Sequence, residues 1–457
     1  MHSEALSQTI LLDNFAGFAY LFANYLIVSI PESQMARIHP FRGLTYSPAL
    51  AAKLDQLVTQ PYDKIDRALQ EKYYARDPHN VIRIIKSDET VTNPESTYPG
   101  AAATLKQWIA DGTLVEAKGP AFYLYYQTFN FLGNKYVRKG FMASVMLDEE
   151  NVKSHEHTLA GPKADRLRLL KALETNDELI FMLYSDPDGE SVKLMDSIAA
   201  NHKPALECRD DYGELHQVWV ADDPETVAKL QTLVSSCDLF IADGHHRYET
   251  ACNFKRECVE HGWKPGENQG FDHRMMGLFP MEDPGLVILP THRLIRNVEN
   301  FSGPKLLAAL GENFKITPLS SAEALFAEMD TFETDQVFGM KAIGTNDEFY
   351  FLETREQGGP NRTLGVTILH STILENELGI DAKVLSAGTH VDYVRSRQES
   401  IDAVGKDGIQ AAFILNPTSV EDVKTVAAAG KRMPQKSTDF YPKLLAGLVM
   451  MKLDILK

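Results

Sequence analysis

L-F-I-A-D-G-H-H-R-Y-E-T-A, residues 239–251, places an acid, a glycine, two histidines and an arginine directly after an apolar run. The first four letters predict a short buried strand, and the letters from Arg247 onward repeat with a helical period. The D-G-H-H-R part therefore falls on the turn and on the first turn of the helix. A helix N-terminus carries unpaired backbone N–H groups and the positive end of the helix dipole, which together favour a bound anion.

The cations in this stretch are unfavourable at a helix start unless something compensates them. Arg247 and two ionisable histidines cost about 0.3–1 kcal/mol per charge there. A phosphate would compensate, because Gly244 lets the backbone approach it and Arg247 can bind two of its oxygens, with Asp243 as an N-cap or a functional carboxylate. In a second interpretation, which the residues leave equally open, Asp243 caps the helix and pairs with Arg247, while His245 pairs with Glu249.

Composition restricts the class of protein. The 457 residues exceed one ordinary core and predict two or three domains. The net charge of -17, from 46 basic and 63 acidic residues, argues against binding to nucleic acid or to an anionic membrane. The four cysteines form no C-x-x-C pair, which predicts buried thiols and a reducing compartment. We therefore predict a cytoplasmic protein, and the sequence does not predict its oligomeric state.

The N-terminus contains an apolar run without any charge, at residues 15–30. The run is shorter than the roughly 20 residues that span a membrane, and no basic segment precedes it, so a span or signal peptide is the minority interpretation. Met35 opens a stretch that resembles a natural protein start. Residues 1–34 are therefore interpreted either as an extension absent from the native protein or as a packed apolar helix.

Helical and strand-like patterns alternate along the rest of the chain, which predicts a mixed α+β fold of the α/β class with several domains. The proposed regions are an α+β region at 35–147, a middle region with the D-G-H-H-R stretch at 148–297, and an α/β region at 298–457. Helices are predicted within 61–78, 101–112, 321–329 and 419–430, the third with Ser321 as its N-cap. Strands are predicted at 80–85, 121–129, 137–147, 348–354 and 411–418, with Gly133-Asn134 as the turn of a hairpin.

A second group of polar residues lies upstream, in S-H-E-H-T at residues 154–158 and in the basic helix that follows. Glu156 near a phosphate could deprotonate a substrate hydroxyl, and Lys163, Arg166 and Arg168 could neutralise a phosphoryl group in transfer. The alternative is a solvated loop acid followed by an ordinary charged helix face.

The C-terminal stretch M-P-Q-K-S-T-D-F-Y-P-K-L, residues 433–444, has two interpretations. Lys436 and the hydroxyls beside it could close over a phosphate. The favoured alternative is a rigid loop that packs Phe440 and Tyr441 into the core. Similarly, His292 and Arg293 either line a pocket or cap an edge strand, and the edge strand is favoured.

The D-G-H-H-R stretch resembles the signature of a bacterial family known as domain of unknown function 1015. The resemblance extends from residue 35 to residue 453. Other matching pieces, in the same order, include R-I-H-P-F-R-G-L-T-Y, P-Y-D-K-I, S-H-E-H-T, P-K-A-D-R-L-R-L-L, M-E-D-P-G-L-V-I-L-P-T-H-R and M-P-Q-K-S-T-D-F-Y-P-K-L. The family resemblance implies no settled activity.

The same stretch is distantly similar to the phosphate-contacting motif of the ParB/sulfiredoxin-like superfamily. That resemblance implies a nucleotide-binding core in which the motif starts a helix and holds nucleotide phosphates. Sulfiredoxin has a cysteine where this chain has His245, which disfavours sulfinic-acid reduction. Free-serine kinases of the group carry D-G-H-H-R and an upstream catalytic glutamate, for which Glu156 is the candidate here.

The predicted function is binding of ADP or ATP and transfer of phosphate to a small hydroxyl compound, with Mg²⁺ as a possible aid. No G-x-x-x-x-G-K-[ST] loop or protein-kinase motif set is present, so the phosphate cradle must differ from both. The predicted catalytic residues are Glu156 and Asp243, and the predicted nucleotide-binding residues are Gly244, His245, His246, Arg247, Arg166 and Lys436. Two alternatives stay open: a non-catalytic nucleotide sensor, and a metal-dependent phosphohydrolase that uses His155, His157, Asp243, His245 and His246.

Overall fold

The computed structural model describes residues 37–86, 94–149, 152–153, 160–235, 237–332, 334–346, 348–355, 363–429, 433–434 and 436–457. Helices and sheets are mixed in it, which confirms the predicted fold class. Two large sheets carry most of the strands, and three small sheets join distant parts of the chain. The interpretations of residues 1–34 and of S-H-E-H-T lie outside the described residues.

A nine-stranded sheet has the order β6-β11-β8-β13-β5-β4-β10-β9, with β1 paired to β5. Its centre is the predicted hairpin of β4 and β5. Phe131 pairs with Asn134, so the two residues of the turn are Leu132 and Gly133, and both have a positive φ. The turn therefore lies one residue earlier than predicted. The strands are β1 (Ile38–His39), β4 (Phe122–Phe131), β5 (Asn134–Met146), β6 (Val152–Lys153), β8 (Ile180–Tyr184), β9 (Leu206–Arg209), β10 (Leu215–Ala221), β11 (Leu239–Asp243) and β13 (His273–Pro280).

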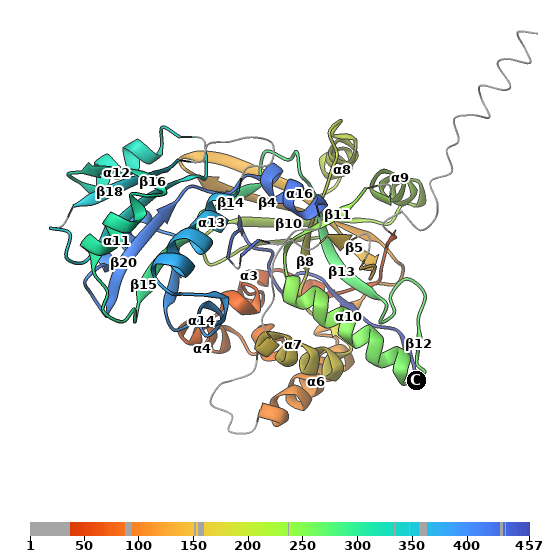
Figure 1. Ribbon diagram of the computed structural model, residues 1–457. Coiled ribbons are helices and arrows are strands. Elements are labelled where there is room, and N and C mark those ends of the chain that lie inside the picture. The colour runs from red at the N-terminus through yellow and green to blue at the C-terminus, as the bar shows by residue number, and fades with distance from the viewer. Residues whose placement is uncertain are drawn as a thin grey trace, which may run out of the picture. The chain divides into compact units, whose positions relative to one another are not determined.

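Helices pack on this sheet from two sides. Figure 1 shows α8 (Glu190–Asn201) and α9 (Pro224–Ser235) above the sheet, and α6 (Pro94–Ala110), α7 (Ala160–Leu173) and α10 (His245–Glu260) below it. Apolar side chains of α8 and α9, including Met195 and Leu230, share one buried cluster with the sheet residues Leu124 and Met182. α10 packs along α7, which in turn contacts α6.

Short helices fill the N-terminal region: α2 (Pro48–Ala51), α3 (Leu54–Leu57), the 3-10 helix η2 (Tyr62–Lys64), α4 (Arg67–Arg76) and α5 (Ile82–Ile85). The last of these corrects the predicted strand at 80–85. Hydrogen bonds fix the start of this helix: Asn80 Oδ1 accepts the Ile82 N–H at 2.9 Å, and the Val81 N–H donates to the Leu57 carbonyl at 2.8 Å. All three isoleucines of this single helical turn are buried. A short run of buried β-branched residues is equally typical of a buried strand, so its pattern does not distinguish the two.

A six-stranded sheet has the order β16-β18-β17-β20-β15-β19. β15 lies between β20 and β19, so the edge-strand interpretation of His292 and Arg293 was wrong. Ser321 caps α12 as predicted, with its hydroxyl accepting the Ala324 N–H at 3.1 Å. The strands are β15 (His292–Arg296), β16 (Phe314–Leu319), β17 (Val337–Ala342), β18 (Phe349–Thr354), β19 (Val391–Val394) and β20 (Ile409–Leu415). The helices are α11 (Gly303–Leu310), α12 (Ala322–Met329), α13 (Gly365–Ile368), the π-helix η3 (Leu369–Glu377), α14 (Ala382–Ser386), α15 (Arg397–Ala403) and α16 (Val420–Ala428).

The C-terminal residues pair with strands from distant parts of the chain. β21 (Asp439–Tyr441) pairs with β14 (Val287–Leu289), and β23 (Ile455–Leu456) pairs with β12 (Lys264–Pro265). A four-stranded sheet has the order β3 (Leu114–Glu116), β2 (Gly43–Tyr46), β22 (Met450–Lys452) and β7 (Thr175–Asn176). The strand β21, which pairs with β14, also contacts β11, the strand that leads into the D-G-H-H-R stretch.

The proposed regions 35–147, 148–297 and 298–457 stay a prediction. The nine-stranded sheet takes strands from both of the first two, and the six-stranded sheet begins with β15, just before the third. In the part of the chain that the structure describes, none of the four cysteines forms a disulfide. None of the helices described is long and apolar enough to cross a lipid bilayer.

Candidate functional site

The D-G-H-H-R stretch connects β11 to α10 as predicted, with a left-handed glycine between them. Gly244 is the N-cap of α10, at φ 97° and ψ 26°, and its N–H donates to Asp243 Oδ1 at 3.0 Å. A Cβ at this position would lie 3.2 Å from the Arg247 guanidinium nitrogens. The backbone conformation therefore favours glycine, and a larger residue would also displace the Arg247 guanidinium by a few tenths of an ångström.

Asp243 lies among cations at the end of β11. Its Oδ2 is 3.2 Å from Lys443 Nζ and 3.8 Å from Arg247 Nη2. Burial by itself would raise the pKa of this carboxyl, but attraction to Lys443, then to Arg247 and Lys64, holds the pKa well below its usual range. Asp243 is thus an ionised carboxylate at neutral pH, suited to accept hydrogen bonds or to ligate a cation, and poorly suited to take up a proton.

Lys443 is a site residue that sequence reasoning missed. Its side chain is buried, and its ammonium lies 3.2 Å from Asp243 Oδ2 and 3.0 Å from Asp439 Oδ1. Asp439 also pairs with Arg395 at 2.5 Å and with Lys64 at 3.5 Å. A chain of alternating charges therefore joins the turn after β11 to β21 and to the residue that follows β19.

The predicted lysine of the same C-terminal stretch, Lys436, has an exposed side chain. Its backbone carbonyl accepts a hydrogen bond from Arg293 Nη2 at 2.9 Å, and its φ is 58°. Phe440 is buried, and the Tyr441 hydroxyl donates to Glu214 at 2.6 Å, in agreement with the packing interpretation of this stretch. Sequence reasoning chose the lysine beside the hydroxyls, whereas the lysine after the second proline is the buried one.

Arg247 is buried and faces the start of β8. Its Nη1 donates to the Leu179 carbonyl at 2.5 Å. Against the effect of burial, the carboxylates of Glu178 and Asp243 stabilise the charged guanidinium and raise the pKa of Arg247. Burial raises the pKa of Glu178 to about 7, against the opposing effect of Arg247, and Glu178 Oε1 accepts the Tyr62 N–H at 2.8 Å. Asp243 thus pairs with Arg247, as the second interpretation of the stretch expected. The N-cap of α10 is the glycine that follows, however, so the prediction of Asp243 as the N-cap was wrong.

The other predicted binding residues occupy different surroundings. His245 is buried and His246 is half-buried in the first turn of α10, while Glu249 pairs with Lys163 of α7 at 2.8 Å. Arg166, also on α7, is buried above the Tyr62 ring, with its guanidinium carbon 4.2 Å from the ring centre. It pairs with Asp165 at 2.6 Å and donates to the Ile85 carbonyl at 2.7 Å.

Arg166 and Arg247 share a neighbour in Glu178, because both guanidinium groups attract the Glu178 carboxylate. Arg166 also lies over the ring of Tyr62, whose backbone N–H donates to Glu178. Glu156, with the neighbouring His155 and His157, lies outside the described residues, so its catalytic role stays a prediction. Within the described ranges no group of three or more His, Cys, Asp or Glu side chains is arranged to hold a metal ion.

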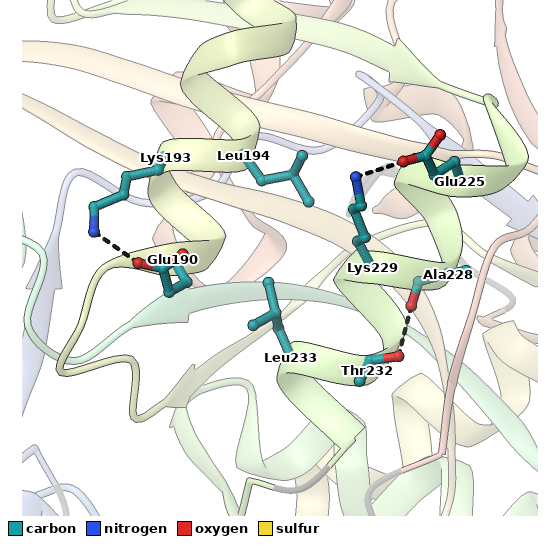
Figure 2. A pocket seen from close by; sticks show the side chains of 8 residues that line it. All are labelled: Glu190, Lys193, Leu194, Glu225, Ala228, Lys229, Thr232 and Leu233. Atoms are coloured by element: carbon teal, nitrogen blue, oxygen red, sulfur yellow. Dashed lines mark hydrogen bonds and ion pairs between the residues drawn. The ribbon is translucent and has the colours of Figure 1, made fainter.

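A pocket of about 630 Å³ lies elsewhere, between α8 and α9 (Figure 2). Two ion pairs flank it, Lys193–Glu190 at 2.7 Å and Lys229–Glu225 at 2.6 Å, and Leu194 and Leu233 extend between the helices. Its acids and bases are matched in number and paired, so this pocket offers no excess positive charge for a phosphate.

The family of the chain is shown by a family model described as Protein of unknown function (DUF1015), which matches residues 38–375. The chain belongs to this family, and the family predicted from the motifs is confirmed. A search of curated proteins found no match.

Several solved structures are similar to the chain at low identity. A free serine kinase in complex with AMP is 12% identical, covers 65% of this chain and 86% of its own, and has a TM-score of 0.34. A conserved hypothetical protein from Pyrococcus furiosus is 12% identical, with coverage of 69% and 95% and a TM-score of 0.34. SbnI with a C-terminal truncation, from Staphylococcus aureus, is 11% identical, with coverage of 67% and 85% and a TM-score of 0.31. At such TM-scores these likenesses assign no chemistry to this chain.

Proposed function

We propose that the chain binds a nucleotide through its phosphates at the turn between β11 and α10, and that it transfers a phosphoryl group to a small hydroxyl compound. The observation that carries the proposal is the convergence of Arg247 and Lys443, both buried, on the carboxylate of Asp243. This residue directly precedes the left-handed Gly244, which is the N-cap of a 16-residue helix. A helix N-terminus, with the positive end of its dipole, and two fixed cations are together features that bind phosphate in proteins.

Each residue of the turn has a distinct role in this proposal. The Gly244 backbone approaches the phosphate, and the first amides of α10 donate to its oxygens. Arg247 and Lys443 neutralise negative charge, which is the main requirement of phosphoryl transfer. Asp243, ionised and 25% exposed at its side chain, is the carboxylate of the turn that could ligate a Mg²⁺ ion, which would supply further charge neutralisation.

Arg247→Ala is expected to abolish stabilisation by nucleotide. For the natural protein, ADP or ATP at about 100 times its dissociation constant should add about 2.7 kcal/mol to the free energy of unfolding. The variant should lose this gain because it lacks the guanidinium that faces the phosphates. The measurement is the melting temperature with and without nucleotide, each variant being compared with its own ligand-free value.

Arg256→Ala is the matched control, because Arg256 lies on the same helix with its side chain 61% exposed. It should keep the full nucleotide effect. A natural protein that does not respond to ADP or ATP, with or without Mg²⁺, would contradict the proposal, as would an Arg247→Ala variant that responds like Arg256→Ala.

Glu156→Gln is expected to keep nucleotide binding and to lose phosphoryl transfer at least about a hundredfold, since a glutamine cannot accept the proton of the acceptor hydroxyl. The test measures ADP release from ATP in the presence of a panel of small hydroxyl compounds, together with nucleotide affinity. Equal loss of binding and of turnover would remove Glu156 from the catalytic role, and tight binding without any turnover in the natural protein would indicate a nucleotide sensor.

A further inference from the structure

Two arginines of the nine-stranded sheet, Arg138 on β5 and Arg274 on β13, are buried without forming an ion pair among the described residues. Arg138 satisfies its donors within the protein. Its Nε donates to Gln127 Oε1 at 3.1 Å, its Nη1 donates to the Tyr441 carbonyl at 3.0 Å, and its Nη2 donates to Gln127 and to the Pro442 carbonyl. Arg138 therefore has the contacts of a structural arginine.

Arg274 differs from Arg138 in its donors. Its Nη2 donates to the Glu178 carbonyl at 3.0 Å, but its buried Nε has no acceptor in the protein. The side chain is only 3% exposed, so bulk water does not replace the missing acceptor. A buried guanidinium with an unused donor is costly, and proteins keep such a group where a ligand or ordered water completes it.

The surroundings of Arg274 place it beside the proposed phosphate site. It bonds to the carbonyl of Glu178, and Arg247 bonds to the carbonyl of the next residue, Leu179. Two guanidinium groups thus lie along adjacent peptide units. The same short segment, residues 176–179, carries further unused polar atoms, since the buried Asn176 amide and Asp177 Oδ2 have no hydrogen-bond partner.

The charges near this segment are unevenly matched. Arg247 has Asp243 within 3.8 Å and Arg166 has Asp165 within 2.6 Å, but Arg274 has no carboxylate at such a distance among the described residues. Burial lowers the pKa of Arg274 to about 10; Asp177 opposes this shift and Arg247 adds to it. Arg274, which has no carboxylate of the described residues within ion-pair distance, is therefore held near another cation, an arrangement that a bound anion would relieve.

We propose that Arg274 and Arg247 together bind an oxyanion group of a small ligand, a phosphate or a carboxylate, beside residues 176–179. The planar guanidinium fork matches both groups in geometry, so the two sources share one chemistry. The proposal rests on the proposed function in sharing Arg247, and it adds that a ligand of the site carries an oxyanion which Arg274 recognises.

The test compares Arg274→Met, Arg274→Lys and Arg138→Met with the natural protein. Melting temperatures are measured with inorganic phosphate and with glycolate, each in the presence and absence of ADP. At least one of the two anions should stabilise the natural protein. Arg274→Met should weaken the apparent affinity for that anion about tenfold or more, because a charged hydrogen bond is lost. Arg274→Lys, which keeps the charge without the fork, should restore only part of the affinity, and stabilisation by glycolate but not phosphate would identify a carboxylate site.

Arg138→Met is the matched control for burial. It should lower the ligand-free melting temperature, because it breaks bonds to three protein groups, while the folded fraction keeps its response to the anion. The inference is overturned if neither anion stabilises the natural protein. It is also overturned if Arg274→Met binds the anion normally, which would mean that buried water alone accepts from Arg274. A third contradicting result is that Arg138→Met abolishes binding as Arg274→Met does. If ADP still raises the melting temperature of the natural protein in any of these cases, the proposed function stands. If ADP does not raise it but an anion does, only the proposed function is contradicted.

Discussion

Lys443→Met is expected to lower the free energy of unfolding by about 3–5 kcal/mol, because it removes the cation that two carboxylates of a buried charge cluster share. The lysine ammonium contacts the carboxylates of Asp243 and Asp439, and Asp439 is itself only 6% exposed. Methionine fills a similar length without charge, so the loss would reflect electrostatics more than packing. The measurement is urea unfolding near pH 7.5, followed by circular dichroism.

Lys229→Met provides the control, since Lys229 forms a surface pair with Glu225 at 2.6 Å, with both side chains largely exposed. Exposed pairs of this kind contribute about 0.3–0.5 kcal/mol. The double variant Lys443→Met, Asp439→Asn should recover part of the loss, because it also removes one of the stranded carboxylates. A loss below about 1 kcal/mol for Lys443→Met would contradict the importance assigned to the cluster.

Acidification is expected to destabilise the fold well above the range in which ordinary carboxylates titrate, and His292 is a principal cause. Burial, then Arg397 and Arg293, lowers the pKa of His292 to about 3, while its Nδ1 accepts the Leu415 N–H at 3.2 Å. In the unfolded chain the pKa of a histidine is about 6.5. Between these two values the unfolded state binds a proton that the folded state does not, so the free energy of unfolding falls as the pH falls from about 6.5 towards 3.

This one histidine should contribute a slope of about 1.4 kcal/mol per pH unit within that window. His292→Asn should reduce the slope by about that amount, because asparagine keeps an acceptor for the Leu415 N–H but does not titrate. His202→Asn is the control, since His202 is exposed on the surface. The measurement is urea unfolding at several pH values between 7.5 and 4.5, and an unchanged slope in His292→Asn would show that His292 does not cause the acid sensitivity.

Elements with one-sided or capped patterns could be predicted from the sequence. The strand and helix on either side of Gly244, the helix capped by Ser321 and the hairpin of β4 and β5 all follow from local periodicity and turn chemistry. The run at 80–85 could not be predicted in this way. Its isoleucines are buried on every side, so the burial that decides between strand and helix comes from the surrounding chain.

The candidate site was predictable only where its residues are neighbours in the sequence. Asp243, Gly244 and Arg247 lie within one helical turn, so a short stretch shows their charge conflict. Lys443 lies 200 residues from Asp243, and its stretch contains another lysine, Lys436, with equally suitable neighbours. The pairing of β21 with β14 decides between the two lysines, and no local pattern contains that pairing.

The sequence by itself determined that a helix N-terminus with an unusual density of cations follows a buried strand, and that the chain belongs to its family. These are local properties of spacing and residue type. Only the tertiary structure decided which charges are paired: Arg247 with Asp243 and Asp243 with Lys443, while Arg274 has no carboxylate of the described residues within ion-pair distance. Compensation depends on burial and on distances between segments that are far apart in the chain, and those distances exist only once the strands have paired.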